Sequence, residues 1–257
     1  MESKSSSNST LTYRLRPFIQ DDIPSIVPLC NDLILAKRLA RLPHPYTEDS
    51  AKYFLNVVCK SENEQVWAIE IITKTDVKTN VTLIGAISLS SSRVESPSTD
   101  TTASYEGIQD LVLGIWIGRK FWRNGHATKS LEILLSHVFN NSHSVEYSIV
   151  AEVFDDNVAS MSLLKNKFGF KRTGGKEATS MARPNEKNIP TSILRLNRFQ
   201  YWKEITNVER KVEIFTTGSC TTYMLFFSAF FVLVSSLLLI RVSNVLHQTH
   251  PSIGYMD

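Results

Sequence analysis

The chain has 257 residues, with 28 Lys and Arg against 25 Asp and Glu, a net charge of +3 and 42% hydrophobic content. The hydrophobic content suits one sizeable domain plus an appendage. The small charge argues against a nucleic-acid partner, because nucleic-acid binders usually carry a clustered basic face. Three scattered cysteines, Cys30, Cys59 and Cys220, lack the spacing of a metal site and favour reduced thiols.

The N-terminal half predicts alternating strands and helices. Residues 1–10 are polar and Ser-rich, without the apolar run of a signal peptide, and we expect a disordered tail. Thr47 is a good N-cap and starts a helix with acidic residues in its first turn. The elements predicted around it are a strand at Leu11–Arg16, two short helices within Asp21–Ala40 broken near Asn31, strands at Val66–Ile72 and Leu83–Ser90, and a surface loop at Ser91–Gly107.

The most informative stretch follows that loop. The apolar, β-rich run Leu111–Gly118 predicts a strand, and the apolar stripe within Leu131–Val138 predicts a helix. Between them lies the turn Trp122–Ala127, which contains Gly125. A strand, a short turn and a helix start leave backbone N–H groups unpaired beside the positive end of the helix dipole. This arrangement can bind a phosphate, although such joints also occur simply as packing devices.

A second strand–turn–helix segment comes next. Tyr147–Phe154 predicts a strand, and the polar run Asp155–Ser160 leads into a helical pattern over Met161–Phe168. Beyond it, Lys171–Pro190 is polar and predicts irregular structure. Thr191–Trp202 predicts a return of the chain to the sheet.

Together these segments resemble a known family. The runs W-x-x-G-x-A-T, at Trp122–Thr128, and D-N-x-A-S-x-x-L-L-x-x-x-F-G-F, at Asp156–Phe170, resemble motifs of the GNAT acetyltransferases. They are most similar to the branch of ribosomal-protein N-acetyltransferases of the RimJ/RimL type. Leu15–Pro17 and Pro43–Thr47 agree with that branch, and the resemblance covers roughly Leu11 to Trp202.

The resemblance implies that acetyl-coenzyme A lies in a V-shaped gap between two parallel strands, here Leu111–Ile117 and Tyr147–Phe154. Main-chain groups of the first strand would pair with the pantetheine arm as an added strand would. The pyrophosphate would lie on the turn amides. Many family members have Gln or Arg at the position of Trp122, but this difference does not weaken a site formed by backbone amides. The implied cofactor-binding residues are Leu113, Ile115, Ile117, Arg123, Asn124, Gly125, His126, Ala127, Thr128 and Asn157.

Three polar residues have two interpretations each. Arg123 contacts phosphate or is a solvated turn residue. Asn157 caps the following helix, and the resemblance implies that it also bonds the pantetheine arm near the thioester. Ser160 protonates the leaving thiolate or is a first-turn capping serine. Many relatives carry a Tyr acid where this chain has Lys165, so the usual acid has no counterpart here.

A general base should accept the proton of the attacking amine, which must be neutral to react. Some relatives have Glu where this chain has Val112. Asp110, two residues earlier on the same strand face, and Glu152, on the facing strand, are the candidates. Either carboxylate can equally be a solvated strand-end charge. His44 and Tyr46 would flank the acceptor pocket or pack within their own loop.

The C-terminal part differs in kind. No charged residue occurs between Glu213 and Arg241, and about 20 helical residues at roughly 1.5 Å each cross a hydrocarbon core of roughly 30 Å. Residues 218–240 therefore predict one transmembrane helix, with a buried core helix as the alternative. More basic residues precede this span than closely follow it, which places the N-terminal domain on the cytosolic side. The chain resembles a tail-anchored membrane protein.

The sequence thus predicts an α/β fold, a GNAT-type mixed twisted sheet with helices on both faces, plus one C-terminal transmembrane helix. The implied reaction is direct acetyl transfer from acetyl-coenzyme A to a primary amine of a protein or small molecule, without a metal. The alternative is a catalytically silent acyl-coenzyme A-binding module or scaffold at a membrane. The predicted parts are a tail (1–10), the acetyltransferase domain (11–203), a linker (204–217), the transmembrane helix (218–240) and a short C-terminal tail (241–257).

Overall fold

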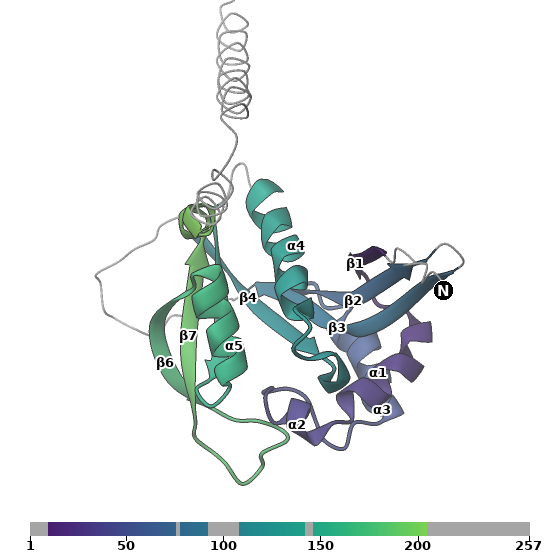
Figure 1. Ribbon diagram of the computed structural model, residues 1–257. Coiled ribbons are helices and arrows are strands. Elements are labelled where there is room, and N and C mark those ends of the chain that lie inside the picture. Colours follow the sequence, from purple (N-terminus) through teal and green to yellow (C-terminus); the bar gives the residue numbers. More distant parts are fainter. Residues whose placement is uncertain (1–9, 76–77, 92–107, 142–145, 205–257) are drawn as a thin grey trace, which may run out of the picture. The chain divides into compact units, whose positions relative to one another are not determined.

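The computed structural model describes residues 10–75, 78–91, 108–141 and 146–204. They form a seven-stranded sheet with helices packed against it (Figure 1). The elements are β1 (Thr10–Arg16), η1 (Gln20–Asp22), α1 (Ile23–Cys30), α2 (Leu33–Ala36), α3 (Glu48–Tyr53), η2 (Phe54–Val58), β2 (Glu64–Lys74), β3 (Thr79–Ser91), β4 (Ile108–Ile117), η3 (Arg119–Phe121), α4 (His126–Asn141), β5 (Glu146–Phe154), α5 (Val158–Ser162), η4 (Leu163–Lys167), β6 (Lys171–Ala178) and β7 (Ile189–Asn197).

The chain divides into two units, Met1–Glu204 and Ile205–Asp257, and the described residues all belong to the first. The predicted transmembrane helix at 218–240 lies outside the described residues, as do both predicted tails and the linker, apart from Thr10 and Glu204. Within the described ranges, no helix is both long enough and apolar enough to span a bilayer.

The sheet is mixed, as predicted. Its strand order is β1-β2-β3-β4-β5-β7-β6, and β4 and β5 are the parallel pair, whereas the other neighbours are antiparallel. Parallel strands need a crossover connection, and α4 supplies it between β4 and β5. Because the strand order runs β4-β5-β7, the C-terminal strand β7 lies on the outer side of β5. The pair β4–β5 therefore stands in the middle of the sheet.

Helices cover both faces of the sheet. Helices α1 to α3 share a buried apolar cluster with Ala68 of β2 and Trp116 of β4. The neighbouring Ile69 is also fully buried but lies outside that cluster, because successive strand residues face opposite sides. Helix α4 lies across the other face (Figure 1), and its predicted apolar stripe is confirmed, with Leu131 and Leu135 fully buried.

The predicted break near Asn31 and the predicted helix start at Thr47 are confirmed, whereas the second short helix ends at Ala36 rather than Ala40. Helix α1 ends at Cys30, Asn31 follows it, and α2 starts at Leu33. The Oγ1 of Thr47 accepts a hydrogen bond from the backbone amide of Ser50 at 3.2 Å, as an N-cap does.

The prediction of irregular structure over residues 171–190 is wrong at its N-terminal end. Lys171–Ala178 form the edge strand β6, which pairs with β7. Most of its side chains are exposed and it contains Gly174 and Gly175, so no apolar alternation marks it. Polar residues are typical of an edge strand, where they oppose further pairing. The partner strand, rather than the local sequence, creates β6.

Candidate active site

Strands β4 and β5 pair over only part of their length. The register joins Ile108–Val112 to Glu146–Val150 and then stops, although β4 continues through Leu113–Ile117 and β5 through Ala151–Phe154. On their outer sides both strands stay paired to their ends, β4 with β3 and β5 with β7. We call Ile108–Val112 the closed half of β4 and Leu113–Ile117 the open half. The open half borders a gap, as the predicted V-shaped site requires.

The turn after β4 contains two residues with left-handed backbone. Arg123 has φ 61° and Gly125 has φ 75°. A Cβ on Gly125 would meet no atom within 4 Å, so the backbone conformation rather than packing requires glycine here. In the described part of the chain, no backbone amide from Arg123 to Thr128 donates a hydrogen bond. Unpaired backbone N–H groups at the start of a helix are the donors that bind an anion.

Side chains of this turn hold it in place. The Nε1 of Trp122 donates to the carbonyl of Ile117 at 2.6 Å, and the Nδ2 of Asn124 donates to the carbonyl of Trp122 at 3.2 Å. His126 is buried, with its Nδ1 2.8 Å from the Oη of Tyr13 on β1. Burial lowers the pKa of His126. The turn is therefore fixed against the end of the open half, and its amides remain available.

Asn157 lies just beyond the end of β5. Its Oδ1 accepts a hydrogen bond from the amide of Ser160 at 3.3 Å, which confirms the N-cap interpretation. Its predicted contact with the pantetheine arm stays a prediction. The side chains of Asn157 and Ser160 are both half-buried, and Lys165, on the following turn, is exposed. The two sequence motifs thus lie just after the ends of the two strands that border the gap.

The two predicted candidates for the base lie in ion pairs. Asp110 belongs to the closed half and binds Arg195 of β7, whose Nη1 also donates to the Oγ of Ser148 at 3.1 Å. Glu152 accepts a hydrogen bond from Lys176 of β6 at 2.6 Å. Since β7 and β6 lie on the side of β5 away from β4, this contact draws Glu152 away from the gap. Both carboxylates have a structural partner, and their catalytic roles stay predictions.

Tyr46 packs within the fold. Its side chain is buried in the cluster of α1 to α3, and burial raises its pKa. Its amide donates to the Oδ1 of Asn31 at 3.1 Å. His44 is exposed. Tyr46 therefore packs in the fold, but in the cluster of α1 to α3 rather than within its own loop.

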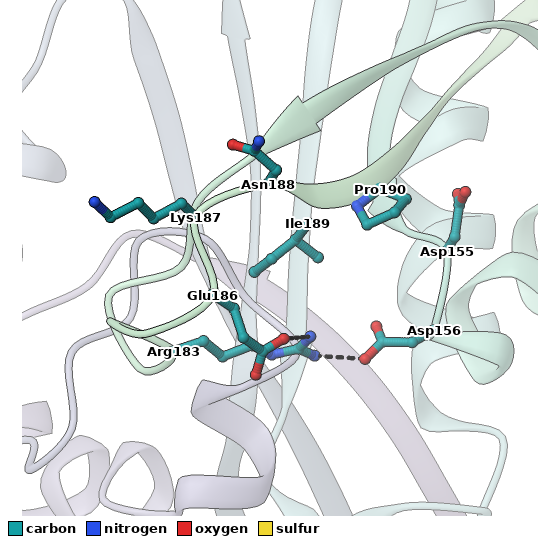
Figure 2. A pocket seen from close by; sticks show the side chains of 8 residues that line it. All are labelled: Asp155, Asp156, Arg183, Glu186, Lys187, Asn188, Ile189 and Pro190. Atoms are coloured by element: carbon teal, nitrogen blue, oxygen red, sulfur yellow. Dashed lines mark hydrogen bonds and ion pairs between the residues drawn. The ribbon is translucent and has the colours of Figure 1, made fainter.

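A pocket of about 500 Å³ lies between the end of β5 and the β6–β7 loop (Figure 2). Figure 2 shows the buried guanidinium of Arg183 between Asp156 and Glu186, to which it donates at 2.8 and 3.5 Å. It also lies 5.2 Å from the ring centroid of Phe154. Nothing in the sequence pattern indicated Arg183, because its partner Asp156 is distant along the chain. The residues that line the pocket are Asp155, Asp156, Arg183, Glu186, Lys187, Asn188, Ile189 and Pro190.

Comparisons with known proteins agree with this geometry. A family profile described as an acetyltransferase (GNAT) domain matches residues 13–171. Spermidine N-acetyltransferase from Vibrio cholerae, solved with CoA and spermine, is 17% identical, with 74% of this chain and 98% of that chain covered and a TM-score of 0.52. The Salmonella typhimurium acetyltransferase that modifies the N-terminal serine of a 50S ribosomal protein is 14% identical, with coverages of 75% and 96% and a TM-score of 0.52.

A third structure is the microcin C7 self-immunity acetyltransferase, solved with acetyl-CoA and AMP. It is 15% identical, with 72% of this chain and 92% of that chain covered and a TM-score of 0.54. A comparison with curated protein sequences gave no match. At these identities the structures show the fold alone.

GNAT acetyltransferases use acetyl-CoA as co-substrate, and similar structures were solved with CoA or acetyl-CoA. The residues of this chain fit that molecule, because the open half of β4 and the unpaired amides after it offer donors to an extended arm and to a pyrophosphate. The matched region contains the gap, the turn and Asn157, and it spans more than half of the chain. This chain belongs to the GNAT acetyltransferase family.

Proposed function

We propose that the chain is an N-acetyltransferase that moves the acetyl group of acetyl-CoA directly to a primary amine. The observation that carries this proposal is the half-open β4–β5 pair, which leaves Leu113–Ile117 beside a gap that ends at a turn of unpaired amides. A site of this kind holds the thioester beside the acceptor. Such proximity alone can supply roughly 7–11 kcal/mol.

Each part of the site has a proposed role. The amides from Arg123 to Thr128 bind the pyrophosphate, with Gly125 allowing close approach, and Asn157 orients the pantetheine arm. Ser160 is the candidate acid for the leaving thiolate, because Lys165 stands where many relatives carry a Tyr. Unchanged turnover in Ser160→Ala would remove Ser160 from this role.

The acceptor is a protein α-amino group, a lysine side chain or a small amine. The solved relatives support this class, since one is named for spermidine and another for the N-terminal serine of a ribosomal protein. Membership of the RimJ/RimL-like branch is part of the proposal. Its support is the motif pair at Trp122–Thr128 and Asp156–Phe170.

The second candidate is a catalytically silent acyl-CoA-binding module. Lys165 and Val112 stand where relatives carry a Tyr acid and a Glu, and the ion pairs of Asp110 and Glu152 favour structural roles for these carboxylates. A silent module would bind acetyl-CoA and transfer nothing.

One assay separates the two candidates. The full-length chain, purified with detergent present, is incubated with acetyl-CoA and three acceptor probes: a peptide with a free α-amino serine, an N-terminally blocked peptide with one lysine, and spermine. Thiol release and mass spectrometry of each probe report the transfer. An acetylated probe supports the enzyme, whereas acetyl-CoA binding by calorimetry without any acetylated probe supports the silent module.

We also propose that residues 218–240 anchor the chain in a membrane, with the acetyltransferase domain on the cytosolic side. The support is the run without charge between Glu213 and Arg241. The full chain should resist carbonate extraction from membranes, and a truncation after Lys211 should be soluble. Recovery of the full chain in the soluble fraction without detergent would refute the anchor.

A further inference from the structure

A serine hydroxyl lies beside the open half of β4. Gly114 is the second residue beyond the point where pairing with β5 stops, and Ser88 of β3 is its register partner. A Cβ on Gly114 would lie 2.7 Å from the Oγ of Ser88. The hydroxyl therefore occupies the space that a side chain at position 114 would fill. Trp116, on the same face as Gly114, packs against the cluster of α1 to α3, so this hydroxyl is on that face.

The hydroxyl of Ser88 is hydrogen-bonded to a carboxylate. The Oγ of Ser88 donates to the Oε1 of Glu64 at 3.3 Å. Arg41 donates to both oxygens of Glu64, at 2.8 and 3.1 Å. The side chain of Glu64 is 11% exposed and that of Arg41 is 74% exposed. A chain of polar groups thus leads from the hydroxyl beside Gly114, through Glu64 and Arg41, to solvent.

The register also relates Glu64 to the position of the missing base. Ser90 is the partner of Val112 on one side and of Glu64 on the other. Register partners share a face of the sheet, so Glu64 lies two strands from Val112 on the same face. Glu64 of β2 can therefore act as a base in the region where β4 has Val112 in place of a Glu.

Ser88 lies at the distance from the phosphate-binding turn at which the thioester of a bound acetyl-CoA is expected. The turn that offers the amides is tied to Ile117 by Trp122. From Ile117 to Gly114 is three residues, roughly 10 Å along the strand. A pantetheine arm bound at the turn runs along the open half over this length, so its thioester lies near Gly114.

We propose that Ser88 and Glu64 form the proton relay that serves the attacking amine, an inference that rests on the proposed function. The acceptor nitrogen forms a bond to the thioester carbonyl carbon, its proton passes to the Oγ of Ser88, and the hydroxyl proton of Ser88 passes to Glu64. The C–S bond then breaks, and the leaving thiolate takes a proton from the Oγ of Ser160, the candidate acid, which regains a proton from solvent. Glu64 returns its proton to solvent beside Arg41. Ser88 meets the reacting nitrogen, whereas Glu64 acts through Ser88.

The test compares three variants of the full-length chain in detergent, with acetyl-CoA and the probe peptides and spermine as acceptors. Glu64→Gln and Ser88→Ala should each lower kcat by roughly 10²–10⁴-fold and leave the Kd for acetyl-CoA unchanged. Arg41→Gln is the matched control, because it breaks the same ion pair and keeps the carboxylate. It should retain kcat within about tenfold and leave the Kd for acetyl-CoA unchanged.

Other results overturn the relay. If Glu64→Gln and Arg41→Gln lower kcat and Tm equally, the pair is only structural and the inference fails, while the proposed function stands. If Glu64→Gln or Ser88→Ala keeps wild-type kcat, the inference fails in the same way. If the wild-type chain acetylates none of the probes, the proposed function fails and the relay fails with it.

Discussion

The two halves of β4 make opposite use of the same strand. The closed half, Ile108–Val112, pairs with β5, and Asp110 within it is bound by Arg195 from beyond β5. The open half, Leu113–Ile117, keeps its bonds to β3 and has no paired partner on its β5 side in the described part of the chain. The closed half pairs its backbone with β5, whereas the open half leaves the backbone groups on its β5 side for a ligand.

The difference indicates where the sheet can bind a ligand. Buried backbone donors and acceptors are almost always paired in native proteins. A strand with one edge left open in the middle of a sheet therefore indicates a partner outside the fold. The open half also ends at the turn whose amides are unpaired, so strand and turn together offer donors along a continuous path.

The largest effect should come from blocking the turn at the open end. Gly125→Glu places a side chain and a negative charge at the proposed pyrophosphate site, and we expect acetyl-CoA binding to be abolished. Isothermal calorimetry on the folded variant measures it. Gly125→Ala is the control, since its Cβ meets open space but the left-handed backbone costs about 1–2 kcal/mol. Undiminished affinity in Gly125→Glu would refute the site.

The closed half should respond in stability rather than in binding. Asp110→Ala leaves Arg195 with Ser148 as its remaining partner among the residues it contacts in the ion-pair cluster. The side chains are 18% and 34% exposed, and we expect a loss of about 2 kcal/mol, between the values of exposed and fully buried pairs. Chemical denaturation measures it, and the Kd for acetyl-CoA should not change. Unchanged stability with abolished transfer would instead make Asp110 the base.

Asn157 combines both kinds of role and should show a smaller effect. Asn157→Ala removes an N-cap, which costs about 1 kcal/mol, and weakens acetyl-CoA binding. Thr47→Ala is the matched control, because the side chain of Thr47 likewise accepts a hydrogen bond from the amide three residues on, at the start of α3. Thermal unfolding and calorimetry on both variants separate the two contributions. Equal Kd values for acetyl-CoA in the two variants would limit Asn157 to capping.

The smallest expected effect concerns the support of the turn by His126. Burial lowers the pKa of His126 in the folded state, so its contribution to stability is present above the unfolded value of about 6.5 and is lost as pH falls below it. The Tm of the wild type should therefore fall more between about pH 7.5 and about pH 5.5 than the Tm of His126→Asn. An NMR titration that gives His126 a pKa above 6.5 would contradict this account.

Local patterns in the sequence predicted the parts of the site that are contiguous in the chain. The turn around Gly125, the apolar stripe of α4 and the caps at Thr47 and Asn157 depend on neighbouring residues, whose spacing is visible in the sequence. The strands at Leu111–Ile117 and Tyr147–Phe154 were likewise predicted.

Pairings across strands could not be predicted in the same way. Arg195 contacts Asp110, and Ser88 contacts Glu64, only because the sheet register brings distant segments together. The edge strand β6 was missed because it lacks apolar alternation and depends on β7. The register thus decides which side chain each carboxylate contacts, and no local sequence pattern contains this information.

Hydrogen exchange of the full-length chain can show whether acetyl-CoA occupies the open half of β4. Exchange is followed by mass spectrometry with and without saturating acetyl-CoA. We expect new protection over Leu113–Ile117 and over the amides from Arg123 to Thr128. The closed half, Ile108–Val112, should change little between the two conditions because it is already paired with β5. Protection that appears elsewhere and leaves Leu113–Ile117 unchanged would contradict the account.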